Sequence, residues 1–451
     1  MKFMRTKKTA VIICGITGDL SRTKLVPALE ELYSGARLSS VPAIIGTGRK
    51  ALSGEDLQAL FLINNEKFRS LLYYHQGIDG LKRFCENQFQ YDNLVTFLSL
   101  PPEAYERTAE ELYREGFREN VRIIVEKPFG FDLRSSRKLN RTLTQLYKEE
   151  QIFRIDHYLA KEAVQNILVF RFTNTLFQPV WNSHYIESIQ ISALEESGIR
   201  ERGVYFDKAG IIRDMVQNHL TQLLCLLTME APASLSAEDI RAEKMSILKV
   251  LKVERSCRWQ YENYRKEKGV SSESETETYS EMELSINNFR WSGVPVYLRT
   301  GKAVNRTGIE IAIVFKPQPP ILYNRDRALE KNRIIFKVQP SAGIIVDIAS
   351  KVPGGNFQLT NANLAFCYRD ISPERIPDAY LKLLMDVIEG DRTLFVSAEE
   401  TEQAWKVFED CLGTGVVKSY PAGTLPESCF CCEWIDFSPY MNFCVEREDA
   451  L

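Results

Sequence analysis

The sequence contains no long uncharged apolar run. Its most apolar long segment, residues 211–229, includes Arg213 and Asp214, whereas a membrane-spanning helix needs about 20 mostly apolar residues. The basic residues 1–8 lead into a short apolar stretch that Asp19 interrupts, and no small-residue cleavage site of a signal peptide follows. We therefore expect no membrane segment and no signal peptide, and we expect the protein to be cytoplasmic.

An excess of charge of one sign is also missing. The chain carries 57 basic and 60 acidic residues, a net charge of −3. This balance excludes a general attraction to nucleic acid or to an anionic membrane, so we expect neither as a partner. Of the 451 residues, 44% are hydrophobic and 26% charged, which excludes disordered and fibrous chains. The length predicts two domains, or one large core with an appended layer.

Histidine is scarce, and no cysteines have the spacing of ordinary zinc ligands. There are only four histidines, so a histidine among other polar residues is informative. The ten cysteines are scattered, with Cys429, Cys431, Cys432 and Cys444 crowded near the end of the chain in a pattern that begins C-x-C-C. Because this pattern differs from zinc ligand pairs, we expect reduced thiols and no metal site.

Short apolar runs alternate with helical patterns over the first 150 residues or so. Strands are predicted at 9–14, 41–47, 94–100 and 122–126, and helices at 20–33, 57–88 and 103–115. This alternation is typical of an α/β Rossmann domain with a doubly wound parallel sheet. We place this domain at residues 1–155.

The strict alternation stops near residue 156, and longer strand candidates follow. They are residues 185–193, 281–287, 309–315, 333–339 and 343–349. A second, α+β domain with a large mainly antiparallel sheet fits them, and we place it at residues 156–451. Residues 266–281 are polar, rich in Ser and Glu and without periodicity, so we expect a solvated loop there.

The turn after the first strand has the features of a phosphate-binding loop. It contains Gly15, Thr17, Gly18, Asp19 and Leu20, with a strand before it and a helix after it. Glycines let the backbone approach a pyrophosphate, which the helix N-terminus then favours. The motif is G-x-x-G without a third glycine, so a purely structural tight turn stays an alternative.

Two further strand ends favour a phosphorylated dinucleotide. An NAD enzyme usually carries an acid at the end of its second strand, whereas this chain has Arg49, which suits the 2′-phosphate of NADP. Lys127 and Pro128 end the strand at 122–126, where a lysine can reach both cofactor and substrate. The alternative for Arg49 and Lys127 is a solvated cation on a loop.

A polar cluster follows at Asp156, His157, Tyr158 and Lys161. The last three can donate to phosphate oxygens, and Asp156 can orient another base. Further along, Asp214 and His219 lie on one apolar helix. An imidazole oriented by an aspartate such as Asp156 is the usual group that removes a hydroxyl proton as hydride leaves. The alternative is that His219 is a hydrogen-bonded core residue, which is the more common role of a histidine among apolar helix residues.

Several segments together resemble the glucose-6-phosphate dehydrogenase family. They are GITGDLSRTKL, VEKPFGFDL, RIDHYLAKE, GVYFDKAGIIRDMVQNHL, VPVYLRTGKAV and KVQP, in that order from about residue 11 to residue 339. The resemblance implies oxidation of D-glucose 6-phosphate to 6-phospho-D-glucono-1,5-lactone with NADP, the first step of the oxidative pentose phosphate pathway, with NAD as a poorer cofactor. It also implies a homodimer built on the large sheet, which can pair into a homotetramer.

The resemblance also implies roles for individual residues. His219 is the general base and Asp156 holds its imidazole. Substrate binding falls to His157, Tyr158, Lys161, Glu195, Asp214, Lys302 and Gln339, and cofactor binding to Gly15, Thr17, Gly18, Asp19, Leu20, Arg49, Lys127 and Pro128. Thr307 stands where the family has a second basic residue, which leaves Arg306 as the nearest cation.

Two other functions stay open. Strand ends of the type Glu-Lys-Pro occur in several sugar oxidoreductases, so another NADP-linked sugar dehydrogenase is one alternative. A catalytically weakened member that acts as a sugar-phosphate-binding, nucleotide-binding or regulatory protein is the other. The presence of His219, Asp156 and Lys161 speaks against the second alternative, because a non-catalytic protein does not need that set.

Overall fold

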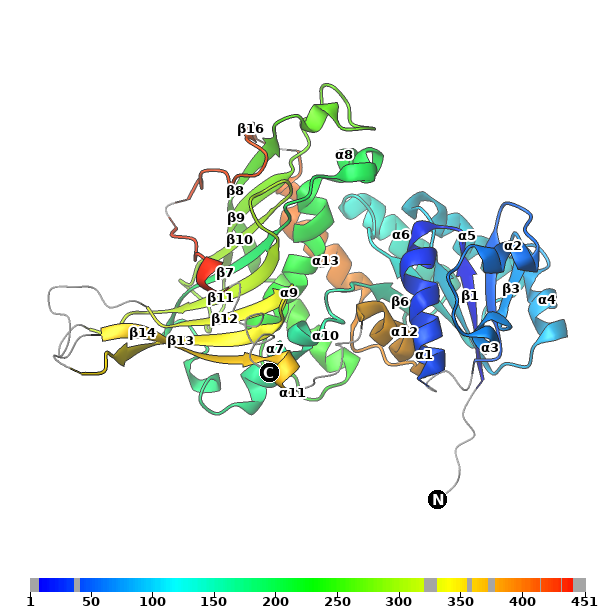
Figure 1. Ribbon diagram of the computed structural model, residues 1–451, viewed down its shortest axis with the longest axis horizontal. Helices are drawn as coiled ribbons and strands as arrows, with labels where there is room; N and C mark the ends of the chain where they lie inside the picture. Colours follow the sequence, from blue (N-terminus) through cyan, green and yellow to red (C-terminus); the bar gives the residue numbers. More distant parts are fainter. Residues whose placement is uncertain are drawn as a thin grey trace, which may run out of the picture. The chain divides into compact units, whose positions relative to one another are not determined.

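The chain forms two compact units in the computed structural model, which describes residues 8–35, 41–319, 331–354, 359–371, 378–413, 415–430 and 432–440 (Figure 1). The first unit takes Met1–Ala160, Pro232–Ala242 and Pro377–Trp405, and the second takes Lys161–Ala231, Glu243–Ile376 and Lys406–Leu451. Two later segments thus belong to the same unit as the N-terminal part of the chain. The predicted division at residue 155 assigns both of them to the second domain.

The first unit is built on a seven-stranded sheet. Its strands are β1 Thr9–Cys14, β2 Ile44–Gly48, β3 Leu72–Gln76, β4 Asn93–Leu98, β5 Val121–Glu126, β6 Ile152–Ile155 and β15 Phe395–Val396. The order is β15-β6-β5-β4-β1-β2-β3, parallel except for the short edge strand β15. Without β15 this is the strand order of dinucleotide-binding Rossmann domains, and the predicted doubly wound parallel sheet is confirmed.

Helices form an apolar core on each face of this sheet. They include η1 Ser21–Leu25, α1 Val26–Ser34, α2 Gly54–Ala59, α3 Glu66–Arg69, α4 Leu81–Gln88, α5 Tyr105–Glu115, α6 Leu133–Leu146 and α12 Ala379–Glu389. On β1, Val11 and Ile13 join one core, while Ala10, Ile12 and Cys14 join the other. Successive side chains of a strand point to opposite faces, so a strand buried on both faces is apolar throughout.

The predicted helix at 57–88 is wrong in its middle. Two short helices, α2 and α3, are followed by strand β3, which pairs with β2 in parallel, and only α4 continues as a helix. Strand β3 lies at the edge of the sheet and is mostly half-exposed, so its sequence lacks the continuous apolar run that marks the central strands. Pairing with β2 decides its conformation.

The second unit contains a nine-stranded sheet. Its strands are β7 Ile186–Leu194, β8 Leu251–Tyr261, β9 Tyr279–Ile286, β10 Val296–Gly301, β11 Gly308–Phe315, β12 Arg333–Gln339, β13 Gly343–Lys351, β14 Leu359–Cys367 and β16 Val417–Tyr420. The order is β14-β13-β12-β11-β7-β10-β9-β8-β16, and only the β7–β10 and β8–β16 pairs are parallel. The predicted large, mainly antiparallel sheet is confirmed.

Helices and the C-terminal segment pack on opposite faces of this sheet. The helices include α7 Glu162–Thr173, α8 Gly203–Ile211, η6 Ile212–Leu220 and α9 Thr221–Thr228. On β12, Phe336 packs against Phe170 of α7, while its neighbour Ile335 packs against Ile435 and Phe437. Gln190 of β7 also holds the C-terminal segment, because its amide bonds the backbone carbonyl of residue 433 (3.0 Å) and the backbone N–H of Ile435 (2.9 Å).

Two sequence-based expectations fail in this unit. The stretch 266–281 is exposed at its start, but Glu277 and Thr278 are buried and β9 begins at Tyr279, so the second half is not a solvated loop. The expectation of reduced thiols is also wrong, because Cys257 of β8 forms a disulfide with Cys429. Cys431 and Cys444 lie outside the described residues.

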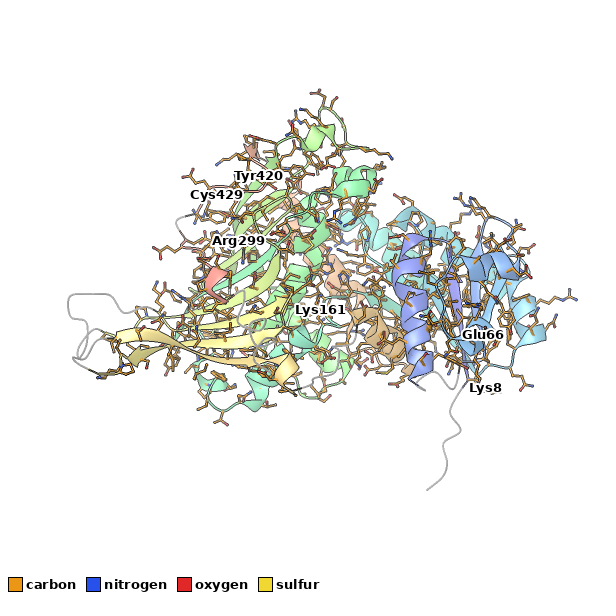
Figure 2. The ribbon with its side chains drawn as sticks, in the orientation of Figure 1. Lys8, Glu66, Lys161, Arg299, Tyr420 and Cys429 are labelled. Carbon is orange, nitrogen blue, oxygen red and sulfur yellow. A yellow bond between two sulfur atoms is a disulfide. The ribbon has the colours of Figure 1, made fainter. Side chains whose placement is uncertain are left out.

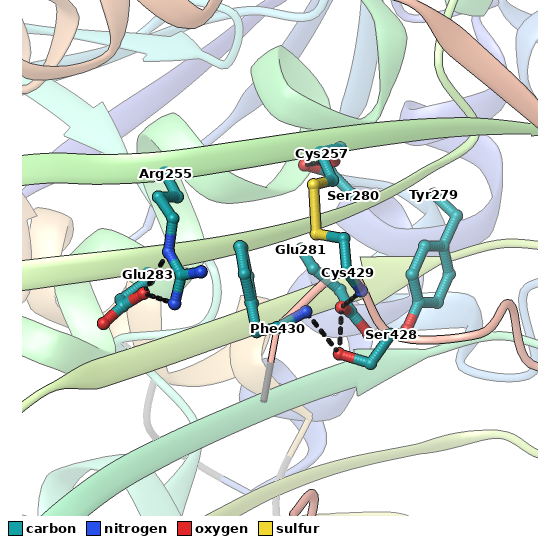
Figure 3. The surroundings of a disulfide bond; sticks show 9 residues. All are labelled: Arg255, Cys257, Tyr279, Ser280, Glu281, Glu283, Ser428, Cys429 and Phe430. Carbon is teal, nitrogen blue, oxygen red and sulfur yellow. Dashed lines mark hydrogen bonds and ion pairs between the residues drawn. A yellow bond between two sulfur atoms is a disulfide. The ribbon is translucent and has the colours of Figure 1, made fainter. Parts of the chain in front are cut away.

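Figure 3 shows the surroundings of this disulfide. Beside Cys429, the Ser428 hydroxyl donates to the Glu281 carboxylate at 2.7 Å. The bond joins cysteines 172 residues apart, a separation that no local motif reveals. It fastens the C-terminal segment to β8, the neighbour of the edge strand β16.

Among the described residues, no helix is both long and apolar enough to cross a membrane.

Reduction of the Cys257–Cys429 bond should lower stability. Crosslinks of this kind contribute about 2–5 kcal/mol, more for long loops, because they restrict the unfolded chain. We expect Cys257→Ser to lower the melting temperature measured by thermal unfolding, and dithiothreitol to have the same effect on the unmodified protein. Cys432→Ser, in a free cysteine of the same segment, is the matched control. Equal melting temperatures for Cys257→Ser and Cys432→Ser would contradict the prediction.

Candidate functional site

The turn after β1 is shaped by close backbone contacts. Gly15 has a φ of +87°, and a Cβ there would lie 2.2 Å from the backbone oxygen of Ser99. The Gly18 N–H donates to the Gly15 carbonyl at 2.9 Å, and the Ser21 hydroxyl donates to the same carbonyl at 3.2 Å. Only glycine fits the first position. The turn leaves Thr17 and Asp19 exposed at the start of the η1–α1 helix, where a pyrophosphate is favoured.

Arg49 follows directly after β2, with an exposed side chain. Its backbone carbonyl accepts a hydrogen bond from the Gln76 amide at 3.1 Å, so the loop is tied to the end of β3. A guanidinium next to the glycine turn fits the 2′-phosphate of a dinucleotide. The glycine turn and Arg49 together therefore match NADP.

The carboxyl ends of β5 and β6 bring two predicted groups to one sheet edge. Glu126 pairs with Ile155 in parallel register, so Lys127 and Asp156 follow at neighbouring positions. The Lys127–Pro128 peptide bond is cis. Asp156 is buried, and its Oδ1 accepts the Tyr158 N–H at 3.0 Å.

Aromatic contacts surround this edge. The His157 ring lies 5.1 Å from Tyr158, edge to face, and stacks on Tyr380 of α12 at 6.2 Å between centroids. Tyr380 also hydrogen-bonds to Glu126, which is 8% exposed. Burial raises the pKa of Glu126 from 4.5 to about 7, although the Tyr380 bond and Lys127 oppose the rise.

Two contacts in the second unit connect predicted substrate residues. The Lys161 ammonium, at the start of α7 (Figure 2), donates to the Gln339 amide oxygen at 2.6 Å. The Lys302 ammonium, with a side chain only 4% exposed, lies 2.7 Å from the Glu195 carboxylate. The Glu195 side chain is 40% exposed, so this buried cation is held by a carboxylate that solvent reaches.

Asp214 and His219 lie on η6, which is wound as a π-helix. A π-helix joins residues five apart by its hydrogen bonds, so residues at this spacing lie above one another. In an α-helix the same two residues would point about 140° apart. The winding therefore puts Asp214 and His219, 2% and 1% exposed, on one face.

The site residues divide between the two units. The first holds Gly15, Thr17, Gly18, Asp19, Leu20, Arg49, Lys127, Pro128, Asp156, His157 and Tyr158, and the second holds Lys161, Glu195, Asp214, His219, Lys302 and Gln339. The pairing of Asp156 with His219 joins the two groups and stays a prediction. In the second unit the contacts described above join Lys161 with Gln339 and Lys302 with Glu195, while Asp214 and His219 share η6.

Arg306 and Thr307, which follow Lys302, are engaged in contacts within the protein. The Arg306 guanidinium pairs with Glu310 at 3.1 Å and lies over the Phe437 ring at 5.1 Å. The Thr307 hydroxyl accepts the Glu196 N–H at 2.9 Å. Arg306 is thus engaged in a buried ion pair under the C-terminal segment.

Sequence reasoning missed Glu126, Tyr380 and Glu277, which contact the predicted site residues or their elements. Glu126 precedes a predicted residue, and a carboxylate at the end of a buried strand could have drawn attention to it. Tyr380 is more than 200 positions from its partners, and no sequence pattern indicated it. Glu277 lies within the presumed solvated stretch.

The fold and the site define a class, namely proteins with a Rossmann dinucleotide-binding domain followed by an α+β domain with a large, mainly antiparallel sheet. Residues 12–166 match the family model "Glucose-6-phosphate dehydrogenase, NAD binding domain", and residues 168–428 match "Glucose-6-phosphate dehydrogenase, C-terminal domain". The chain belongs to the glucose-6-phosphate dehydrogenase family.

Individual relatives agree with this assignment. The glucose-6-phosphate 1-dehydrogenase of Chlamydia muridarum is 38% identical, over 89% of each chain, and that of Bacillus subtilis is 35% identical over 90% of this chain and 91% of the relative. A solved structure, "Glucose-6-phosphate dehydrogenase in complex with its substrate glucose-6-phosphate", is similar with a TM-score of 0.87 and 33% identity. It covers 95% of this chain and 97% of its own.

The Glu126 carboxyl should make stability depend on pH. Between pH 4.5 and about 7 the unfolded carboxyl is ionised while the folded one keeps its proton, so the free energy of unfolding falls as pH rises. The full loss, complete above this window, is about 3 kcal/mol. We expect Glu126→Gln to match the unmodified protein at pH 4.5 and to melt at a higher temperature at pH 8.

The exposed Glu103→Gln serves as the control and should follow the unmodified protein at every pH. If thermal unfolding of Glu126→Gln ran parallel to the unmodified protein from pH 4.5 to 8, Glu126 would not hold its proton in the folded state.

Proposed function

We propose that this protein oxidises D-glucose 6-phosphate to 6-phospho-D-glucono-1,5-lactone with NADP, the first step of the oxidative pentose phosphate pathway. The observation that carries the proposal is the similarity over 95% of the chain to a glucose-6-phosphate dehydrogenase solved with its substrate. Residues 1–155 would bind NADP, and residues 156–451 would bind the sugar phosphate and pair subunits.

The proton of the anomeric hydroxyl goes to His219 in this proposal. Asp156 holds the imidazole, which raises its capacity to accept that proton. Asp214 shares the face of η6 with His219, so it binds a sugar hydroxyl beside the base. NADP, when bound, supplies the acceptor for the hydride.

The phosphate of the substrate binds to His157, Tyr158 and Lys161. Lys161 is oriented by Gln339 at 2.6 Å, which supports a fixed position of its charge before the substrate arrives. Glu195 and Lys302 then receive the sugar hydroxyls as a pair. Because Thr307 adds no cation and Arg306 is engaged by Glu310, Lys161 carries most of the phosphate binding.

NADP binds along the carboxyl edge of the parallel sheet. The turn Gly15, Thr17, Gly18, Asp19 and Leu20 receives the pyrophosphate, Arg49 the 2′-phosphate, and Lys127 with Pro128 positions the nicotinamide. NAD lacks the 2′-phosphate and is the poorer cofactor.

Two related proposals concern assembly and location. We propose a homodimer that uses the large sheet of the second unit, with a homotetramer as a further assembly, and a cytoplasmic protein. The exposed positions of β8 and β14 support the first, because they leave the outer strands of the sheet open to a second copy.

One absorbance assay for reduced nicotinamide separates the candidate functions. The proposal expects turnover with glucose 6-phosphate and NADP. Turnover with another sugar phosphate alone would favour a different sugar dehydrogenase. Binding of glucose 6-phosphate by calorimetry without turnover would favour a regulatory or binding protein.

Replacement of the base tests the mechanism. His219→Asn keeps shape and some hydrogen bonding but accepts no proton, so kcat should fall by about 10²- to 10⁴-fold while the fold persists. Asp156→Asn acts on the same step, so the double variant should be little worse than His219→Asn. Steady-state kinetics with circular dichroism measure both, and additive losses would argue against the pair.

Replacement of Arg49 tests cofactor choice. Arg49→Ala should raise the KM for NADP by about one to two decades, because a charge-assisted bond to the 2′-phosphate is lost. The KM for NAD should stay within about twofold in the same assay. The matched control is Lys50→Ala, one residue further along the same exposed loop. Equal losses with both cofactors would mean that Arg49 serves the fold or the adenine.

A further inference from the structure

The helix that carries Asp214 and His219 starts at a break. Gly210 has φ +70° and ψ 169°, which breaks the helical path near the end of α8, just before η6. Amide groups at the start of a helix have no partners within the helix and need an outside acceptor. Here one residue of another segment, Glu277, supplies the acceptors.

Glu277 contacts the first turn twice. Its backbone carbonyl accepts the Ile211 N–H at 3.0 Å, and its side-chain Oε1 accepts the Ile212 N–H at 3.3 Å. A carboxylate at a helix N-terminus is also favoured by the helix dipole. The side chain is therefore a cap contributed from the segment directly before β9 and not from the helix itself.

The space for this cap depends on Gly210. A Cβ at Gly210 would lie 2.3 Å from Glu277 Oε1, so any other residue would push the carboxylate away. The positive φ at this position also favours glycine. Glycine at position 210 therefore allows both the break in the helix and the approach of the Glu277 carboxylate that caps it.

The carboxylate is buried and charge-paired. Glu277 is 3% exposed, and its Oε2 lies 3.5 Å from the Arg258 guanidinium of β8. Burial raises the pKa of Glu277, whereas the Ile212 N–H and Arg258 oppose the rise. Arg258 in turn donates to the Gly415 carbonyl at 2.5 Å.

The next residue ties in a second part of the site. The Thr278 carbonyl accepts the Lys302 N–H at 3.0 Å. Lys302 holds Glu195 at 2.7 Å, so Glu277 and Thr278 together connect η6 with the strand end that presents Lys302. A displacement of this two-residue segment would move the predicted base and the predicted sugar-binding pair together.

We propose that Glu277 is a positioning residue, which sets the start of η6 through its bond to the Ile212 N–H and so places His219 and Asp214 for the reaction. The proposal rests on the proposed function for its kinetic consequence. Arg258 keeps the carboxylate aimed at the helix.

Two conservative variants separate the hydrogen bond from the charge. Glu277→Asp keeps the charge opposite Arg258 but is one methylene too short to reach the Ile212 N–H. Glu277→Gln keeps the reach and an acceptor oxygen but leaves Arg258 buried without a counter-charge. Both retain most of the side-chain volume, so the fold should survive.

The proposal predicts that Glu277→Asp is the less active of the two variants and Glu277→Gln the less stable. Glu277→Asp should lower kcat by about 10-fold to 100-fold, the loss expected when a reacting group is misplaced by about 1 Å. Its KM for glucose 6-phosphate should rise less than kcat falls. Glu277→Gln should keep kcat within about threefold yet show the lower melting temperature, because an unpaired buried charge is costly.

A matched control comes from the same unit. Glu310 is also buried, its pKa is also raised by burial, and it pairs with Arg306 at 3.1 Å. Glu310→Gln should lower the melting temperature as Glu277→Gln does and should leave kcat unchanged. If Glu310→Gln lowered kcat as much as Glu277→Asp, or if Glu277→Asp kept full kcat, the positioning role would be wrong.

Hydrogen exchange gives a readout that does not depend on activity. The amides of residues 211–214 should exchange faster in Glu277→Asp than in Glu277→Gln, measured by mass spectrometry on the full chain. If the unmodified protein showed no turnover, the proposed function would fail. The exchange comparison would still show whether Glu277 holds the start of η6. Equal exchange in the two variants would overturn it.

Discussion

The π-winding of residues 212–220 is the constraint on which the second half of the site depends. It puts Asp214 and His219 on one face, and it begins where Gly210 breaks the preceding helix and Glu277 caps the new one. A π-helix is rare because its hydrogen bonds are less favourable than those of an α-helix, so it persists only where the surroundings support it. At the start of η6 the surroundings supply the Glu277 carboxylate, which accepts the Ile212 N–H and is itself paired with Arg258.

Other polar groups of the second unit are arranged in the same manner, in pairs that exist before any ligand binds. Lys302 faces Glu195, and Lys161 faces Gln339. Such pairs hold long side chains in one geometry and reduce the entropy that binding must overcome.

In the first unit, two late segments complete the N-terminal domain. Helix α12 brings Tyr380 onto His157 and Glu126, and strand β15 adds to β6. A contact from more than 200 residues away thus shapes the surroundings of the sheet edge where Lys127 and Asp156 follow their strands. This edge is the usual ligand position of open α/β sheets, so a late segment of the chain packs where the cofactor residues are predicted.

The sequence alone determined the elements whose signal is local. Strand β1 is apolar throughout because both faces are buried, and Gly15 follows it because only glycine allows that turn. The family motifs likewise identified the candidate residues from Asp156 to Gln339, because each motif is contiguous.

Tertiary structure decided what depends on partners distant in the chain. Strand β3 forms because β2 offers it hydrogen bonds, Cys257 finds Cys429 across 172 residues, and Glu277 is buried because η6 and Arg258 lie over it. A polar stretch looks the same in a sequence whether water or a helix N-terminus satisfies it. Only folding supplies the partner, and burial then turns an ordinary glutamate into the cap of the helix that carries Asp214 and His219.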